Sequence, residues 1–138
     1  MRRTLMAITA ASASVVVGAT IAIPFAAWLE RTVAPVMVNW TVLGKARSDG
    51  DLLVWGTVVK ARNCRFIPPI LARDDTGQSY IVESMNPVRS MPWAATDTPH
   101  RFGPWRVAGG AGKVLTFEQI HRCHPMWDQV SELGTVTP

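Results

Sequence analysis

The feature that most constrains this chain is an apolar stretch near its start, from Leu5 to Leu29, that holds no charged side chain. As a helix it would measure about 37 Å at 1.5 Å per residue, which exceeds the roughly 30 Å hydrocarbon core of a bilayer. Signal peptides have shorter apolar regions of about 7–15 residues. We therefore predict a transmembrane helix over residues 5–29, after a short tail at 1–4. Cleavage within Ala11-Ser12-Ala13 is the alternative, because this triplet resembles a signal-peptidase site.

The charges that flank the apolar stretch predict its orientation. Arg2 and Arg3 precede it, and basic residues favour the cytoplasmic side. The two cysteines of the chain, Cys64 and Cys123, both follow the stretch, which suits an oxidising compartment. We expect a signal-anchor with a cytoplasmic N-terminus and a C-terminal domain outside the cytoplasm.

Small residues recur every four positions within the predicted span. Such a stripe lets two helix backbones approach closely in lipid, so it predicts a homodimer or docking on another membrane helix. The alternative is that the spacing arose by chance. The stripe consists of Ala10, Ser14, Gly18, Ala22 and Ala26.

The overall charge gives no reason to expect nucleic-acid binding. The chain has 14 Lys and Arg against 10 Asp and Glu. Two of the basic residues, Arg2 and Arg3, lie before the apolar stretch, which leaves a small and interspersed surplus. A nucleic-acid-binding domain would show a basic patch or stripe instead.

After a linker at 30–35, the residues from 36 to 138 read as one extracytoplasmic β-domain. Apolar residues alternate with polar ones in short runs, separated by turn signals such as Ser48-Asp49-Gly50-Asp51 and Asp74-Asp75-Thr76-Gly77. This pattern predicts a small antiparallel β-sandwich, either immunoglobulin-like or an open barrel. The expected strands cover residues 36–43, 52–62, 65–73, 78–83, 101–107, 113–122 and 129–136.

Three places in this domain lead to more specific expectations. Pro68-Pro69 interrupts the third run and predicts an edge strand or a bend, because proline cannot donate to a ladder. Trp40 and Trp55 are expected in the core. Trp93 lies in a long irregular stretch between Ser84 and His100, and we predict that it is an exposed interface aromatic or that it covers an open end of the domain.

The cysteines allow two interpretations. A Cys64–Cys123 disulfide would close a loop of about 60 residues and stabilise the domain by roughly 4 kcal/mol. The alternative is a copper site built from His121, Cys123, His124 and Met126, which are ligand types that copper prefers. Adjacent Cys and His residues point to opposite faces of a strand, which weakens that alternative.

No enzyme motif is recognisable. The chain lacks a G-x-S-x-G element, an H-E-x-x-H element and a phosphate-binding loop. Asp74-Asp75 is a carboxylate pair, but Thr76-Gly77 follows it and predicts a turn. We therefore expect neither an enzyme nor a cofactor.

Two segments of the domain resemble small uncharacterised membrane-anchored proteins of bacteriophages and prophages of Gram-negative bacteria. The resemblance rests on a G-x-x-x-K-x-R-x-C element that ends at Cys64, on Phe102-Gly103-Pro104-Trp105, and on the late run from His121 to Trp127. It implies a phage gene product in the host inner membrane with its C-terminal domain in the periplasm.

These observations together predict a membrane-tethered periplasmic binding module with an unknown periplasmic protein partner. In a phage setting, such a module would act in lysis control or superinfection exclusion. Extracytoplasmic copper handling is the alternative function.

Overall fold

The computed structural model describes residues 20–86, 96–125 and 127–138. The chain divides into two compact units, Met1–Ala34 and Pro35–Pro138, which are described separately.

In the first unit, residues 20–33 form a helix that ends four residues beyond the predicted end at Leu29. Most of the predicted span lies outside the described residues, as do Ala10, Ser14 and Gly18. Ala22 and Ala26 lie in the helix, where their spacing of four places them on one face. Within the described ranges, no helix is both long and apolar enough to cross a bilayer.

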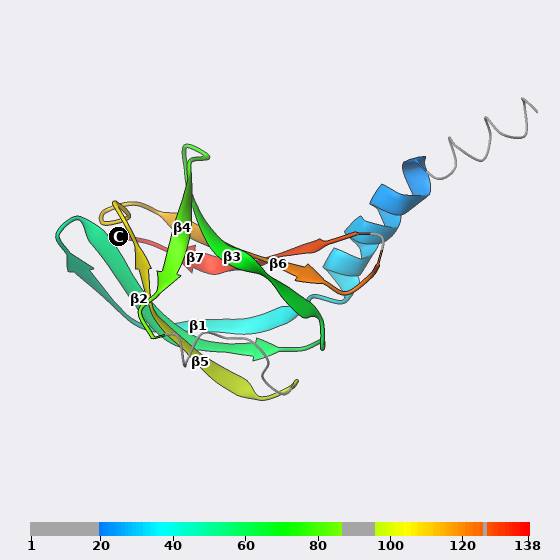
Figure 1. The fold of residues 1–138 in the computed structure, drawn as a ribbon, viewed down its shortest axis with the longest axis horizontal. Coiled ribbons are helices and arrows are strands. Elements are labelled where there is room, and N and C mark those ends of the chain that lie inside the picture. The colour runs from blue at the N-terminus through cyan, green and yellow to red at the C-terminus, as the bar shows by residue number, and fades with distance from the viewer. Residues whose placement is uncertain (1–19, 87–95, 126) are drawn as a thin grey trace, which may run out of the picture. The chain divides into compact units, whose positions relative to one another are not determined.

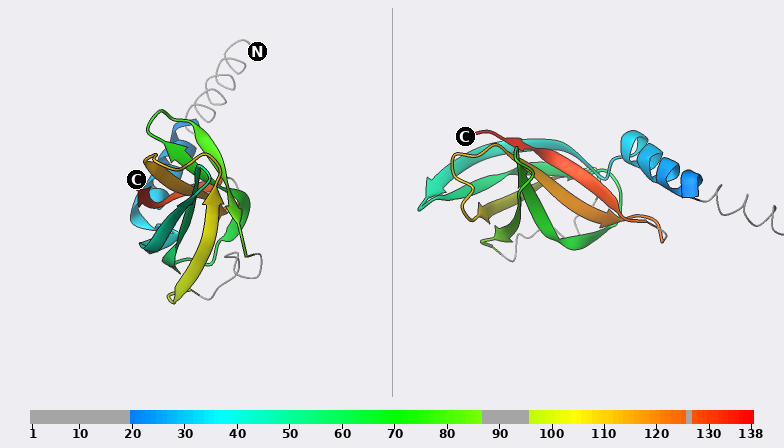
Figure 2. Two further views of the ribbon diagram at one scale, coloured as in Figure 1. Left: turned by 90° about the vertical axis from the view of Figure 1, so that its left-hand side faces the viewer. Right: turned by 90° about the horizontal axis from the view of Figure 1, so that it is seen from above.

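The second unit is mainly β. Its strands are β1 (Met37–Ser48), β2 (Asp51–Lys60), β3 (Arg65–Asp74), β4 (Ser79–Ser84), β5 (Pro99–Val107), β6 (Leu115–Arg122) and β7 (Gln129–Val136). All seven belong to one sheet with the order β1-β2-β5-β4-β3-β6-β7, and every neighbouring pair is antiparallel. Figure 1 and Figure 2 show this sheet as strongly curved.

The curvature brings the two edge strands together. The Lys45 ammonium of β1 donates to the main-chain carbonyls of Thr137 and Pro138, just after β7. The predicted antiparallel β-domain is therefore confirmed as a nearly closed, barrel-like sheet. The sandwich form of the prediction is corrected, because all seven strands of the described residues belong to one sheet. Register shifts in β1, between Val38 and Thr41 and between Val42 and Gly44, bend the strand and favour closure.

Two predicted turns form as their residues indicate. Asp49 and Gly50 both have positive φ, of 51° and 86°, as the tight β1–β2 hairpin turn requires. In the β3–β4 turn, the Asp74 carboxylate accepts hydrogen bonds from the main-chain N–H groups of Thr76 and Gln78. The paired carboxylates predicted as turn formers thus lie in a turn.

Aromatic rings fill the middle of the barrel. Trp40 stacks on Phe102, with ring centroids 4.1 Å apart and planes 12° from parallel, and both rings contact Trp105. Phe117 packs against the same cluster. A side chain at Gly134 would overlap the Trp40 indole, so glycine is what allows this ring to lie against β7. The predicted core position of Trp40 is confirmed.

Two local predictions are wrong in part. Trp55 points outward, because the inward face of β2 is formed by Leu52, Val54, Gly56, Val58 and Lys60. β3 is not an edge strand, since it pairs with both β4 and β6. Pro68-Pro69 instead lies where the β3–β6 register shifts, between Ile67 and Leu71, which agrees with the alternative prediction of a bend.

Candidate functional site

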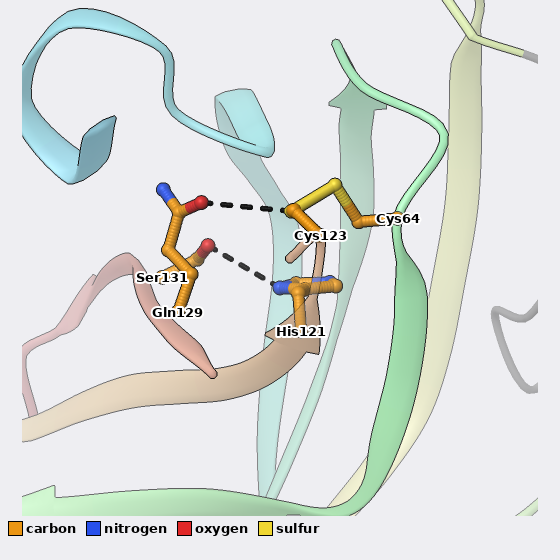
Figure 3. The surroundings of a disulfide bond; sticks show 5 residues. All are labelled: Cys64, His121, Cys123, Gln129 and Ser131. Atoms are coloured by element: carbon orange, nitrogen blue, oxygen red, sulfur yellow. Dashed lines mark hydrogen bonds between the residues drawn. A yellow bond between two sulfur atoms is a disulfide. The ribbon is translucent and has the colours of Figure 1, made fainter. Parts of the chain in front are cut away.

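The two cysteines lie together at one end of the barrel (Figure 3). Cys64 follows β2 and Cys123 follows β6, and their sulfurs are 2.03 Å apart with a Cα–Cα distance of 4.6 Å. The distance fits the disulfide that the sequence predicts. The Gln129 side-chain oxygen lies 3.6 Å from the Cys123 sulfur.

Polar side chains continue inward from the disulfide. The imidazole of His121 is 2% exposed, and its Nδ1 lies 3.3 Å from the Ser131 hydroxyl. Burial lowers the pKa of His121 to about 4, and the positive charge of Lys60 contributes in the same direction. The imidazole is therefore neutral near pH 7. The buried polar residues at this end are Lys60, Gln119, His121, Gln129 and Ser131.

A buried Ser–His pair invites comparison with a hydrolase triad, which needs a third, acidic member. Among the described residues, the buried carboxylate is Asp74, and it is held in the β3–β4 turn by Thr76 and Tyr80. Ser131 and His121 are also shielded from solvent. The pair thus satisfies buried polar groups inside the barrel and offers no access to a substrate.

The predicted copper ligands are not brought together. His121 points into the barrel, the Cys123 sulfur is bonded to Cys64, and the His124 ring stacks on Trp127 at 3.9 Å. Met126 lies outside the described residues. In the described part of the chain, no group of three or more His, Cys, Asp or Glu side chains is arranged to hold a metal.

The outer wall of the barrel has a depression of about 260 Å³. It lies over β1, β2 and β5, where two register shifts meet: Leu43 is the extra residue of β1, and Gly103-Pro104 lies opposite Trp55. Its lining consists of Leu43, Trp55, Gly56, Arg101, Phe102, Gly103 and Pro104.

Trp55 forms a flat platform at this depression. A side chain at Gly44 would overlap the ring atoms of the indole, so the indole lies directly across the glycine backbone. One face of the ring is thereby covered, while the residue is still 38% exposed. Leu43 beside it is 59% exposed, and the buried residue Phe102 also belongs to the lining. The apolar side chains of Leu43 and Trp55 are thus exposed to solvent side by side.

Among the described residues of the lining, Arg101 is the one that carries a charge. None of the ion pairs in the described part of the chain involves it. By contrast, Arg106 further along β5 is bound to Asp51 at 2.7 Å. The depression therefore presents an aromatic face, an aliphatic side chain and a guanidinium group that pairs with no carboxylate of the described residues.

Sequence reasoning selected Trp93 as the exposed aromatic, and Trp93 lies outside the described residues. It missed Trp55, because the run from Leu52 to Val59 is apolar on both faces and alternation alone does not choose between them. The signal in the sequence that could have placed Trp55 on the outer face was the presence of glycine residues on the neighbouring strands. Gly44 lies opposite Trp55 on β1 and leaves room for its indole, whereas Gly103 on β5 allows that strand to approach the β2 backbone closely.

Comparisons with known proteins add no family to this description. A scan against protein-family models found no match, and neither did searches of curated proteins and of solved structures.

Proposed function

We propose that this chain is a membrane-tethered binding module whose β-domain faces the periplasm. The observation that carries the binding role is the Trp55 platform: an indole that lies across Gly44 and is partly open to solvent, beside Arg101, which forms no ion pair with another described residue. Exposed tryptophan and arginine in a concave place are the side chains that most often anchor a ligand or partner.

The tether and its orientation rest on the sequence. The charge-free stretch is long enough to span a bilayer, Arg2 and Arg3 favour a cytoplasmic start, and the two cysteines are placed for a disulfide. With the resemblance to phage proteins, lysis control and superinfection exclusion are the processes in which we place the module. Copper handling is the weaker alternative, because the bonded Cys123 sulfur is not available as a thiolate ligand.

The binding role predicts that the depression is occupied in the cell. Leu43→Cys places a thiol in the depression, and Ile81→Cys places one on β4, where Ile81 is 64% exposed and outside the lining. N-ethylmaleimide crosses membranes, so its reaction rate reports on access alone. We expect position 43 to react several times more slowly than position 81 in cells, and the two rates to converge in purified full-length protein.

Equal relative rates in cells and in purified protein would contradict the proposal. Both variants should first be shown to retain the Cys64–Cys123 bond, since a third cysteine can exchange with it.

A further inference from the structure

The depression at Trp55 has features that select a class of ligand, and this inference rests on the proposed binding role. Its volume of about 260 Å³ is just below the roughly 300–1,000 Å³ of drug-sized pockets. It therefore suits one ring-sized group.

The position of the depression in the sheet disfavours an extended peptide. β2 pairs with β1 on one side and with β5 on the other, so Trp55 lies in the middle of the wall. A peptide that adds to a sheet needs a free strand edge for its main-chain hydrogen bonds. A ligand here must instead be held by side chains.

The lining defines what those side chains can hold. The open face of the Trp55 indole accepts a flat, weakly polar surface, and its electron-rich face attracts the partial positive charge of C–H groups. The Arg101 guanidinium donates in a planar fork that matches a carboxylate. Leu43, Trp55 and Arg101 remain exposed, so the far side of a bound ring stays in water.

From this arrangement we infer that the depression binds one acidic sugar residue, with its pyranose ring on Trp55 and its carboxylate on Arg101. A pyranose ring has an apolar C–H face for the indole and hydroxyl groups for the water side. A flat aromatic acid also stacks on an indole, but its second apolar face would stay in water in this open depression and would contribute nothing to binding. Charge complementarity agrees, because Arg101 is the one charged lining residue and has no partner carboxylate in the described part of the chain.

The inference is tested with three small probes and the full-length protein in detergent. Saturation-transfer NMR with sodium D-glucuronate, D-glucose and benzoate separates the ring from the charge. We expect glucuronate to bind, with saturation strongest on its ring C–H protons. Glucose should bind about tenfold more weakly, as loss of one charge-assisted hydrogen bond predicts. Benzoate should bind more weakly than glucuronate.

Four variants assign the binding to the depression. Trp55→Ala should abolish glucuronate binding, and Arg101→Gln should reduce it to the level of glucose. Gly44→Ala keeps the tryptophan but pushes its ring off the backbone, so it should also weaken binding. Arg65→Gln removes an exposed arginine from β3, outside the lining, and should change nothing. A thermal melt of each variant shows that it is folded.

Several results would overturn the inference: no saturation of glucuronate, equal binding of glucose, tighter binding of benzoate, or an unchanged Arg101→Gln. Binding of an acidic peptide such as acetyl-Ala-Asp-Glu-Ala without binding of glucuronate would also overturn it in favour of a protein partner. These results are distinct from failure of the binding role itself, which would appear as the same ratio of labelling rates at positions 43 and 81 in cells and in purified protein.

Discussion

At the scale of single residues, the barrel interior combines an aromatic cluster with buried polar groups, and only some of these groups form hydrogen bonds. His121 is bonded to Ser131, whereas the Gln119 side-chain oxygen and the indole nitrogens of Trp40 and Trp105 have no hydrogen-bond partner in the described part of the chain. A buried polar atom without a partner costs about 1–3 kcal/mol. Each buried polar residue therefore has its own effect on the unfolding free energy, and single substitutions can measure these effects separately.

His121 should make the domain sensitive to mild acid. Its pKa of about 4 in the folded protein lies below the ordinary histidine pKa of 6.5, so the unfolded chain binds the proton more tightly. The stabilisation is complete above pH 6.5 and falls as the pH drops toward 4, by about 3 kcal/mol in total. Urea unfolding between pH 7.5 and pH 4 measures this loss.

The matched control for this pH dependence is His121→Gln, which should flatten the stability profile between pH 6.5 and pH 4. The lowered pKa values of Asp51, Asp74 and Asp128 act mainly near pH 4 and below, because the ordinary pKa of Asp is 3.8, and both proteins share this contribution. A wild-type profile as flat as that of His121→Gln would contradict the assignment.

Gln119 should be replaceable by an apolar residue of similar size. Gln119→Leu removes the unpartnered buried oxygen, so unfolding free energy should rise by about 1 kcal/mol or stay unchanged. Gln129→Leu is the comparison, because the Gln129 side chain has polar interactions to lose. This variant should have an unfolding free energy about 1–2 kcal/mol lower than that of the wild type. Urea unfolding of both variants decides this. A clear loss for Gln119→Leu would indicate a buried water that bonds to its oxygen.

At the scale of elements, strand positions could be predicted well and strand faces less well. The run from Gln129 to Val136 is β7 to the residue, because alternation and flanking turn residues agree there. β2 was located correctly, but the face of Trp55 was not, because both faces of β2 carry apolar side chains. Register shifts at Leu43 and Gly103-Pro104 form the depression, and such shifts depend on pairing between strands distant in sequence. The binding surface therefore could not be derived from local pattern.

The Cys64–Cys123 disulfide, which joins the segments after β2 and β6, should contribute much of the stability of the β-domain. The cysteines are 59 residues apart, and closing such a loop contributes about 4 kcal/mol in the chain-entropy model. Cys64→Ser and Cys123→Ser should lower the unfolding free energy by similar amounts, since each removes the same bond. Protein purified without reductant should show no free thiol after denaturation. Two titratable thiols would contradict the disulfide and favour a metal site at Cys123. A loss of unfolding free energy in Cys123→Ser but not in Cys64→Ser would do the same.

At the scale of the whole molecule, we propose that the β-domain of the structure is tethered by a membrane anchor that is inferred from the sequence. The barrel could be anticipated only as one of two forms, because closure depends on β1 and β7 meeting across the whole domain. The orientation of the anchor decides whether the disulfide can persist and which ligands the depression can meet.

Helix association is expected from the small-residue stripe. Gly18→Ile would place a branched side chain where two backbones approach, and should weaken the signal of a membrane two-hybrid assay several-fold. Val17→Ile is the control on the neighbouring face of the helix and should leave the signal unchanged. An equal signal from both variants would count against the stripe as an interface.

The central claim, a tethered domain outside the cytoplasm, is tested most directly by reporters fused after Pro138 in the full-length chain. Alkaline phosphatase is active only when exported, and green fluorescent protein delivered through the general secretory route fluoresces only in the cytoplasm. The account predicts an active phosphatase fusion and a dark fluorescent fusion, both recovered in the membrane fraction. A fluorescent fusion together with an inactive phosphatase fusion would place the β-domain in the cytoplasm and contradict the account.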